Sequence, residues 1–321
     1  MNPMQKPLNT PFTPFTTAEE VAHGAHLSGK TVIVTGGASG LGLETVRVLA
    51  DLGAHIIVPA RNTSTARASL AGITNVEVVE MDLIDPASVR IFAERFVATG
   101  APLHLLILSA GIMTPPLFRD SKGREGQFAT NHLGHFRLTA TLWPALKLAG
   151  GARVVVLSSR AHQLPGFDLT DLDFARRPYD KVAAYAQSKA ANALFALALD
   201  IRGQNYGIRA FSVHPGSVFG NLTKHASREE LEAYGILNPD GTPQIDPAQD
   251  KKNFAQGAAT TVWCATAPEL DGLGGVYCED CDIAYVEAEG GFGVRPYAVN
   301  PDLAEALWTE SVRLTGIDVQ G

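Results

Sequence analysis

A tyrosine and a lysine stand four residues apart in the segment YAQSK, residues 185–189. On a helix this spacing places two side chains on the same face, so Lys189 would lie beside Tyr185. A phenol has a pKa near 10, and a cation within about 4–6 Å lowers that pKa by favouring the phenolate. The pair is therefore typical of general acid–base catalysis, which needs a pKa close to the working pH. The alternative is a chance pair on an ordinary amphipathic helix.

A glycine-rich turn, TGGASGLG at residues 35–42, follows the apolar run TVIVT. A strand that leads through glycines into a helix offers backbone N–H groups and a positive helix end to a pyrophosphate. Glycine is required because a Cβ would keep the backbone away from the ligand. We therefore expect a dinucleotide site here, the alternative being a tight turn without a ligand. The residues expected to form it are Gly36, Ser39, Gly40, Leu41 and Gly42.

Short apolar runs alternate with amphipathic segments from residue 29 onward. Seven runs have the length and composition of strands: residues 31–35, 55–59, 76–80, 104–109, 153–158, 208–214 and 274–278. Helical spacing of apolar residues marks residues 41–52, 85–100, 127–149 and 185–204. Continuous apolar strands indicate a parallel sheet covered by helices, and parallel crossovers are right-handed. The sequence predicts an α/β fold of Rossmann type: a doubly wound, mainly parallel seven-stranded sheet with helices on both faces.

No linker or repeat divides this alternation, so we expect one dinucleotide-binding and catalytic domain over residues 29–321. Residues 1–28 form an N-terminal extension, rich in Pro and Thr, that we expect to pack loosely if at all. Residues 220–256 are polar, rich in turn residues, and follow the end of a strand. Ligands of open α/β sheets bind at that edge, so the insertion is a candidate substrate lid. The alternative is a variable surface excursion.

Composition excludes several classes of function. The chain has 26 Lys and Arg residues against 33 Asp and Glu residues, and it contains no basic run. Both facts argue against a nucleic acid partner. Three cysteines are too few for a disulfide scaffold and fit a reducing compartment. No apolar run reaches the roughly 18 residues that span a bilayer, and the N-terminus lacks the features of a signal peptide. We expect a cytoplasmic protein.

Several motifs together resemble the short-chain dehydrogenase/reductase family. The turn has the family's form T-G-x-x-x-G-x-G, and YAQSK resembles its Tyr-x-x-x-Lys helix. The other matching segments are LSAG (108–111), NHLGHF (131–136), VLSSRAH (156–162) and HPGSV (214–218). NHLGHF, SSRAH and the C-terminal AEALWTESVRL are closest to the retinol-dehydrogenase-like branch and the oxidoreductase domain of the WW-domain oxidoreductase. The resemblance runs from about Thr17 to the end of the chain.

The resemblance implies a role for each catalytic residue. Tyr185 would be the general acid in reduction and the general base in oxidation, and Lys189 would lower its pKa and hold the nicotinamide ribose. Ser159 is preferred to Ser158 because the family's serine is the second of this pair, and it would polarise the substrate oxygen. Asn131 would hold a water that links Lys189 to solvent. With these residues and the glycine turn present, the chance interpretation of Tyr185 and Lys189 is set aside.

The cofactor is predicted to be NADP(H) in preference to NAD(H). At the end of the second strand Ala60 stands where NAD-preferring relatives carry an acidic residue, and Arg61 follows. A guanidinium binds a 2′-phosphate through two charge-assisted hydrogen bonds, whereas a carboxylate repels it. The alternative is that Arg61 is merely solvated. The resemblance adds Asp82 and Leu83 at the adenine, Ala110 and Gly111 after the fourth strand, and Pro215, Gly216 and Val218 at the nicotinamide carboxamide.

Other features are given plainer interpretations. The loop 160–184 is longer than in small family members, and we expect it to form a wall of the substrate site through the apolar LPGF at 164–167. Both asparagines of the family's N-N-A-G are missing from LSAG, where Ser109 keeps a hydrogen-bonding side chain. CEDC (278–281) lacks a second ligand pair and is interpreted as ordinary thiols, so no metal is predicted. His132 and His135 are assigned to packing or substrate contact.

We therefore expect an oxidoreductase that moves a hydride between a nicotinamide and a carbonyl or alcohol. The branch resemblance suggests a lipophilic small-molecule substrate. The alternatives are a non-catalytic nucleotide sensor or scaffold and a sugar-nucleotide epimerase, whose relatives use T-G-x-x-G-x-x-G. Family analogy suggests a homodimer or homotetramer through residues 124–149 and 181–204.

Overall fold

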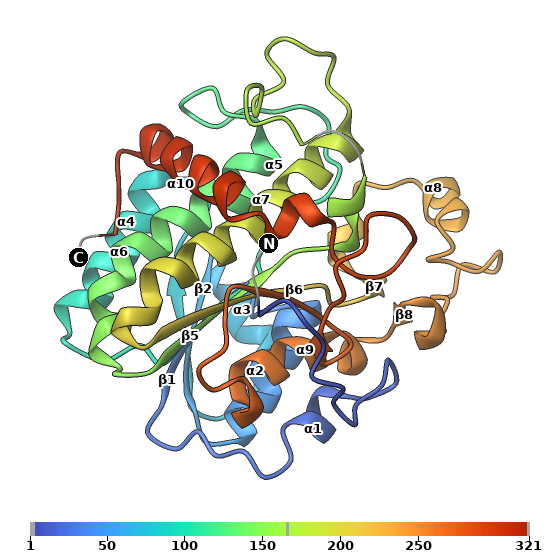
Figure 1. Cartoon of the computed structure of the whole chain (residues 1–321). Helices are drawn as coiled ribbons and strands as arrows, with labels where there is room; N and C mark the ends of the chain where they lie inside the picture. Colours follow the sequence, from blue (N-terminus) through green and yellow to red (C-terminus); the bar gives the residue numbers. More distant parts are fainter. Residues whose placement is uncertain (1–3, 165–166, 320–321) are drawn as a thin grey trace.

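The computed structural model describes residues 4–164 and 167–319, and it is built on one central sheet (Figure 1). The sheet has eight strands in the order β10-β9-β6-β5-β4-β1-β2-β3. Its strands are β1 (Thr31–Thr35), β2 (His55–Ala60), β3 (Val76–Glu80), β4 (Leu105–Leu108), β5 (Ala152–Leu157), β6 (Ile208–Val213), β9 (Val276–Glu279) and β10 (Asp282–Ile283). The reversal of strand order beside β1 is the arrangement of a doubly wound fold.

All seven predicted strands are present and pair in parallel, from β3 across to β9. Their central members are buried over nearly their whole length, as their continuous apolar composition requires. The eighth strand, β10, is antiparallel to β9 and was not predicted. It has only two residues and follows a tight turn at Asp280 and Cys281, both with positive φ, so it carries too few residues for a periodic pattern.

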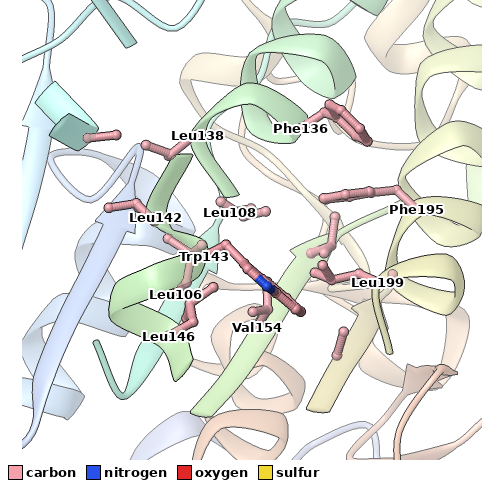
Figure 2. Packing of buried hydrophobic residues seen from close by; sticks show 14 of the residues in the cluster. Leu106, Leu108, Phe136, Leu138, Leu142, Trp143, Leu146, Val154, Phe195 and Leu199 are labelled. Atoms are coloured by element: carbon pink, nitrogen blue, oxygen red, sulfur yellow. The ribbon is translucent and has the colours of Figure 1, made fainter. Parts of the chain in front are cut away.

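Helices cover both faces of the sheet and bury one apolar cluster on each. One face carries α4 (Pro86–Ala98), α6 (His135–Leu148) and α7 (Lys181–Gly203); the other carries α2 (Gly40–Asp51) and α9 (Phe254–Thr266). Figure 2 shows Leu106 of β4 and Val154 of β5 packed with Trp143 of α6 and Leu199 of α7. The remaining helices named below are α1 (Ala18–Val21), α3 (Thr63–Ser69), α5 (Gly126–Phe128), α8 (Arg228–Ala233) and α10 (Pro301–Thr315).

The segment 127–149, expected as one helix, is interrupted. It begins with α5, passes through a π-helix, η1 (Ala129–Gly134), and continues as α6. The helix with the Tyr-x-x-x-Lys motif starts earlier than expected, at Lys181, where the Asp180 carboxylate accepts hydrogen bonds from the backbone N–H groups of Val182 and Ala183. This N-cap fixes where α7 begins and therefore how far Tyr185 lies from the sheet edge.

The N-terminal arm is not loosely packed, contrary to the expectation from its Pro and Thr content. The Gln5 side chain is buried; its amide donates to the carbonyls of Tyr277 and Ala284 at 2.9 and 2.7 Å and accepts from the Tyr277 N–H at 2.8 Å. The Asp282 carboxylate accepts from the backbone of Leu8 and Asn9. The arm thereby satisfies backbone groups at the edge of the sheet, which composition alone does not reveal.

The insertion 220–256 lies beside the carboxyl ends of the strands (Figure 1). Its base is held by a small parallel ladder between β7 (Ser217–Val218) and β8 (Lys251–Lys252). Between these strands it forms the 3₁₀ turns η4 (Asn221–Thr223) and η5 (Pro247–Gln249) and the helix α8. Ser227 and Glu230 form a capping box at the start of α8, which explains why a polar segment folds into a helix here.

The C-terminal helix α10 packs on α6 and α7 (Figure 1). The Trp308 ring lies 4.8 Å from that of Phe136 and 6.0 Å from that of Phe195, centroid to centroid. α10 therefore occupies part of the surface through which these helices were expected to meet a second copy. Within the described residues, no helix combines the length and the apolarity needed to cross a bilayer.

Candidate active site

A cavity of about 950 Å³ opens at the carboxyl ends of the parallel strands, between the sheet edge and the insertion 220–256. This is where open α/β sheets bind their ligands. Every residue predicted to contact the cofactor lines it: Gly36, Ser39, Gly40, Leu41, Gly42, Arg61, Asp82, Leu83, Ala110, Gly111, Tyr185, Lys189, Pro215, Gly216 and Val218. Segments far apart in the sequence are thus brought to one hollow.

The glycine turn brings the start of α2 to the cavity. Ser39 is the N-cap of α2 in an extended conformation, and its side chain makes no capping hydrogen bond. The N–H groups of the first helical turn are therefore left for a ligand. Gly36 has φ +70°, and a Cβ there would lie 2.9 Å from the Ala110 backbone. The turn can approach β4 this closely only with glycine, and the resulting cradle fits a pyrophosphate.

The adenosine end of the cavity is bounded by β2 and β3. Arg61, at the end of β2, is exposed and makes no hydrogen bond or ion pair with any other residue that the structure describes. Asn62, next in the chain, caps α3 by accepting from the Thr65 N–H at 3.1 Å, so the backbone beside Arg61 is fixed. Asp82 follows β3, and its carboxylate accepts from the Ile84 N–H at 3.3 Å.

Tyr185 and Ser159 meet inside the cavity. Ser159 ends β5 and caps the 3₁₀ turn η2 (Arg160–Gln163), with its hydroxyl accepting from the Ala161 N–H at 3.1 Å. Tyr185 is buried on α7, and burial raises its pKa to about 12, opposed by a hydrogen bond to Ser159. The Ser158 hydroxyl instead donates to the Lys189 carbonyl at 2.8 Å and is held away from Tyr185.

Lys189 lies one helical turn beyond Tyr185, as the spacing predicted. Its Nζ is 5.7 Å from the centre of the Tyr185 ring and donates to the Leu157 carbonyl at 3.0 Å. Burial lowers the pKa of Lys189 to about 8. The expected lowering of the Tyr185 pKa is not found in this structure, because burial of the phenol outweighs any effect of the cation.

Asn131 does not line the cavity. It lies in the π-helix η1, where its side-chain amide donates to the Ile112 carbonyl at 3.0 Å and to the Ser188 hydroxyl at 2.9 Å. Its Oδ1 accepts from the Ile112 N–H at 2.9 Å. The side chain therefore joins the loop after β4 to α7, the helix of Tyr185. A π-helix at this point is consistent with a functional site.

His135, assigned from the sequence to packing or substrate contact, is buried and links η1 to the end of β1. Its Nδ1 bonds the Asn131 carbonyl at 2.9 Å, and its Nε2 bonds the Thr35 hydroxyl at 2.9 Å. The Thr35 hydroxyl also accepts from the Ala110 N–H at 3.1 Å. His132 bonds the Ser311 hydroxyl at 2.8 Å among the rings of Phe128 and Phe195, so its assignment to packing is confirmed.

The outer part of the cavity contains residues that sequence reasoning missed. The apolar ones are Met113, Phe118, Val182, Leu222, Leu231, Tyr234 and Ile236. An ion pair of 2.7 Å between Lys181, at the start of α7, and Glu230, on α8, joins the insertion to the catalytic helix. Only the position of the insertion after β6 signalled these contacts, because no motif marks them.

Leu164 and Phe167 of the LPGF segment do not line this cavity, contrary to expectation. Leu164 and Phe167 line a separate hollow of about 470 Å³, and the Phe167 ring stacks on Tyr297 at 6.0 Å. Pro165 and Gly166 lie outside the described residues. Among the described residues of the loop 160–184, those that line the cavity are Arg160, Ala161, Lys181 and Val182.

The three cysteines are buried and free, so CEDC is not a disulfide. Burial raises the pKa of Cys281 to about 12, which keeps its thiol protonated and unreactive at neutral pH. Among the described residues, no group of three or more His, Cys, Asp or Glu side chains is arranged to hold a metal ion. The thiols are therefore explained by packing against α9 and the end of β9.

Comparison with known proteins agrees with this geometry. Residues 30–231 match the family model described as short chain dehydrogenase, so the chain belongs to the short-chain dehydrogenase/reductase family. Members of this family are oxidoreductases that bind a nicotinamide cofactor. The predicted family and fold are thereby confirmed, and the chain is an enzyme of the dehydrogenase/reductase class.

Individual relatives extend over most of the chain. A probable oxidoreductase of Streptomyces lividans is 42% identical over 88% of this chain and 96% of its own length. The WW domain-containing oxidoreductase of Danio rerio is 38% identical over 93% of this chain and 71% of its own. Retinol dehydrogenase 12 of Mus musculus is 37% identical over 91% and 88%. These relatives confirm the branch that the motifs indicated.

A solved structure shares the architecture. It is a protein from Mycobacterium paratuberculosis described as putative and uncharacterized, with a TM-score of 0.72 and 32% identity. The alignment covers 94% of this chain and 98% of that one.

Proposed function

We propose that the protein is an NADP(H)-preferring oxidoreductase that transfers a hydride between the nicotinamide and a carbonyl or alcohol carbon of a lipophilic substrate. The observation that carries the proposal is the meeting of Tyr185 and Ser159 in the cavity, with Lys189 one turn along the same helix. Two hydroxyls at one point can hold a substrate oxygen, and one of them can transfer a proton to it.

The preference for NADP(H) rests on the end of β2. Arg61 is exposed beside the cavity and has no acidic partner among the described residues, while Ala60 supplies no carboxylate to repel a phosphate. Because Arg61 has no ion pair to break within the described part of the chain, its guanidinium can bind a 2′-phosphate without losing the energy of an existing ion pair. Asp82 and Leu83 would lie against the adenine, at the neighbouring strand end.

The bound cofactor supplies or accepts the hydride. In reduction, Tyr185 donates its phenolic proton to the substrate oxygen while Ser159 holds that oxygen by a hydrogen bond. A pKa of about 12 keeps the phenol protonated at neutral pH, as a general acid requires. In oxidation Tyr185 accepts the proton, and positive charge at Lys189 favours the phenolate. Asn131 and His135 position the loop after β4, and Asn131 would support the proton relay by holding a water that links Lys189 to solvent.

The outer cavity suggests the kind of substrate. Phe118, Leu222 and Tyr234 line the cavity and are partly exposed to solvent, and Val182 and Ile236 also line it. Burying apolar substrate surface against such side chains contributes about 25 cal/mol per Å². Residues 220–256 would close over the substrate as a lid, with the Lys181–Glu230 ion pair as its contact to α7. The catalytic unit would comprise residues 29–321.

We also propose a cytoplasmic location, because all three thiols are free and buried in a protein without a disulfide among its described residues. The homodimer or homotetramer suggested by family analogy would have to accommodate α10 on the surface of α6 and α7. The proposed proton transfer by Tyr185 depends neither on the location of the enzyme nor on its oligomeric state.

The test of the proposed function is consumption of NADPH by the purified protein across aldehydes and ketones graded in size and polarity. We expect turnover that increases with apolar size until the cavity is filled, and slower turnover with NADH at equal concentration. Tight binding of NADPH without turnover of any carbonyl would contradict the proposal and favour a nucleotide sensor on the same fold.

A further inference from the structure

Asp250 is a buried carboxylate at the base of the insertion, immediately before β8. Its φ is +67°, a left-handed conformation that side chains other than glycine rarely adopt. Such a backbone persists only where the surrounding contacts determine it. No motif led to this residue, and the mechanism above does not use it.

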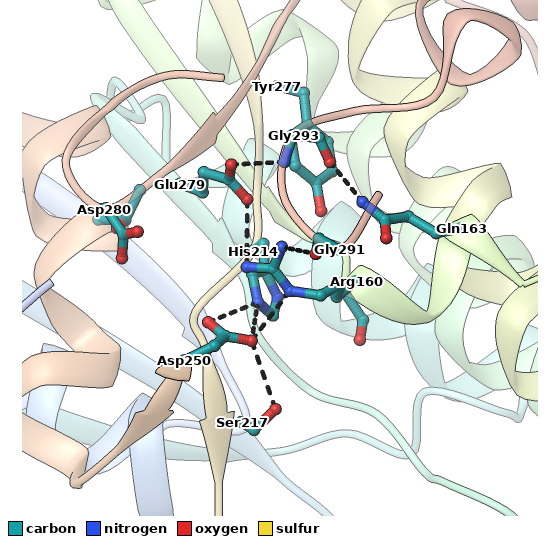
Figure 3. A network of polar contacts seen from close by, with 12 residues as sticks. Arg160, Gln163, His214, Ser217, Asp250, Tyr277, Glu279, Asp280, Gly291 and Gly293 are labelled. Atoms are coloured by element: carbon teal, nitrogen blue, oxygen red, sulfur yellow. Dashed lines mark hydrogen bonds and ion pairs between the residues drawn. The ribbon is translucent and has the colours of Figure 1, made fainter. Parts of the chain in front are cut away.

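The Asp250 carboxylate receives hydrogen bonds from three side chains that belong to two segments, the one after β5 and the turn 214–218 after β6 (Figure 3). His214 Nε2 lies 2.9 Å from Oδ2, Arg160 Nε lies 2.9 Å from the same oxygen, and the Ser217 hydroxyl lies 3.4 Å from it. The Asp250 backbone carbonyl accepts from the Ser217 N–H at 2.7 Å. Asp250 is therefore bound both to the segment that follows Ser159 and to the turn 214–218.

The hydrogen bonds define the tautomer of His214. Its Nδ1 accepts from the Arg160 backbone N–H at 3.1 Å, so the proton of the neutral ring is on Nε2 and is donated to Asp250. Arg160 directly follows Ser159, and His214 directly precedes Pro215 and Gly216. The imidazole and the carboxylate thus join the end of β5 to the turn after β6.

Charge within this cluster favours the ionised carboxylate. Burial raises the pKa of Asp250, but His214 and Arg160 outweigh it and hold that pKa well below its usual range. Arg160 also pairs with Glu279 at 3.3 Å, and Glu279 accepts from the Gly293 N–H at 2.7 Å. Replacing the Asp250 carboxylate would leave Arg160 Nε and His214 Nε2 without their shared acceptor in a largely buried place, which is more costly than losing a surface contact.

We propose that Asp250 is a positioning residue for hydride transfer, through which the base of the insertion fixes Ser159 relative to the nicotinamide turn 214–218. This inference rests on the proposed function and on the family resemblance, which implies that the nicotinamide lies at that turn. Asp250 contacts the segments after β5 and β6, whereas Arg61 and Asp82 follow β2 and β3, on the other side of β1 in the sheet. Its loss should therefore affect the nicotinamide half of the cofactor and leave the adenosine half unchanged.

The test compares Asp250→Asn with the wild type and with Asp240→Asn, a change at an exposed aspartate of the same insertion. Dissociation constants are measured for NADPH, by nicotinamide fluorescence, and for adenosine 2′,5′-bisphosphate, which lacks the nicotinamide half. We expect Asp250→Asn to weaken NADPH binding by about tenfold or more, since hydrogen bonds to a charged group are lost. Binding of adenosine 2′,5′-bisphosphate should stay within about twofold.

A second variant guards against a misfolded Asp250→Asn. Ser217→Ala removes only the 3.4 Å contact and should shift the same ratio of affinities in the same direction, by about twofold. With a carbonyl substrate, kcat should fall in Asp250→Asn more than the KM for the carbonyl rises. Equal weakening of both nucleotides in both variants, or no change in either, would overturn the inference. Failure of the wild type to reduce any carbonyl would overturn the proposed function instead, while the nucleotide comparison would still decide the role of Asp250.

Discussion

The Lys189 ammonium nitrogen lies 5.7 Å from the centre of the Tyr185 ring, and both residues are buried on α7. Burial moves their pKa values in opposite directions, to about 12 for the phenol and about 8 for the amine. The uncharged phenol is therefore the form present at neutral pH. The protonated Tyr185 can therefore act as a proton donor. It can act as a proton acceptor when additional positive charge nearby lowers its pKa.

The depressed pKa of Lys189 predicts how stability depends on pH. Between about pH 8 and its ordinary pKa of 10.5, the unfolded chain binds a proton on this amine that the folded chain does not. The contribution of Lys189 to the free energy of unfolding should therefore rise with pH, by about 2 kcal/mol from pH 8 to about pH 9.5. Tyr185 adds no opposing effect until the pH exceeds its ordinary pKa of 10.0.

Urea unfolding of the wild type and of Lys189→Met at these two pH values measures this contribution. Methionine keeps much of the side-chain volume but cannot titrate, so the variant should lack the rise of about 2 kcal/mol. Taking the difference between the two proteins removes the effect of all other titrating groups. Equal pH dependence in both would mean that Lys189 keeps its ordinary pKa in the folded protein.

Arg61 should determine the choice of nucleotide. Arg61→Ala removes the guanidinium from the end of β2 and should weaken NADPH binding by about 10- to 100-fold, the value of hydrogen bonds to a charged phosphate. NADH binding should change by less than about threefold, because that nucleotide has no 2′-phosphate. The control is Arg67→Ala on α3, an exposed arginine outside the cavity. Similar losses for both nucleotides would show that Arg61 acts on the fold and not on the phosphate.

Trp308 should be a main source of stability for the catalytic helices. Its ring is buried between Phe136 of α6 and Phe195 of α7, and its indole N–H donates to Asp318 at 2.9 Å. Trp308→Ala should lower the free energy of unfolding by about 3–5 kcal/mol. Chemical denaturation measures the change, and Trp308→Phe should recover much of it. A loss below about 1 kcal/mol would mean that α10 contributes little to the core.

The strands and the cofactor turn were predictable because their causes are local. A buried parallel strand needs a continuous β-branched run, and a backbone that approaches β4 within contact distance needs Gly36. Every predicted cofactor residue lines the cavity because the carboxyl ends of parallel strands meet at one edge of the sheet. Tyr185 and Lys189 could be paired from spacing alone because α7 is a regular helix.

The remaining features depend on contacts between distant segments. Gln5 forms hydrogen bonds with the backbone of Tyr277 at the edge of the sheet, although 272 positions separate the two residues in the chain. Asp250 reaches His214 and Arg160 through a loop whose sequence carries no periodic signal. The raised pKa of Tyr185 follows from burial of the phenol, which the nearby cation at Lys189 could not reveal from sequence spacing alone.

The most direct test of the account is the rate of NADPH oxidation by Tyr185→Phe, with the best carbonyl found for the wild type. The change removes one hydroxyl and keeps the buried ring, so the variant should fold and bind NADPH with an affinity within about tenfold of the wild type. Tyr206→Phe, at an exposed tyrosine packed against Trp143, is the matched control. We predict that kcat falls about 10²- to 10⁴-fold in Tyr185→Phe alone, the usual contribution of a general acid. A rate equal to that of the wild type would contradict the assignment of Tyr185 as the proton donor and, with it, the proposed mechanism.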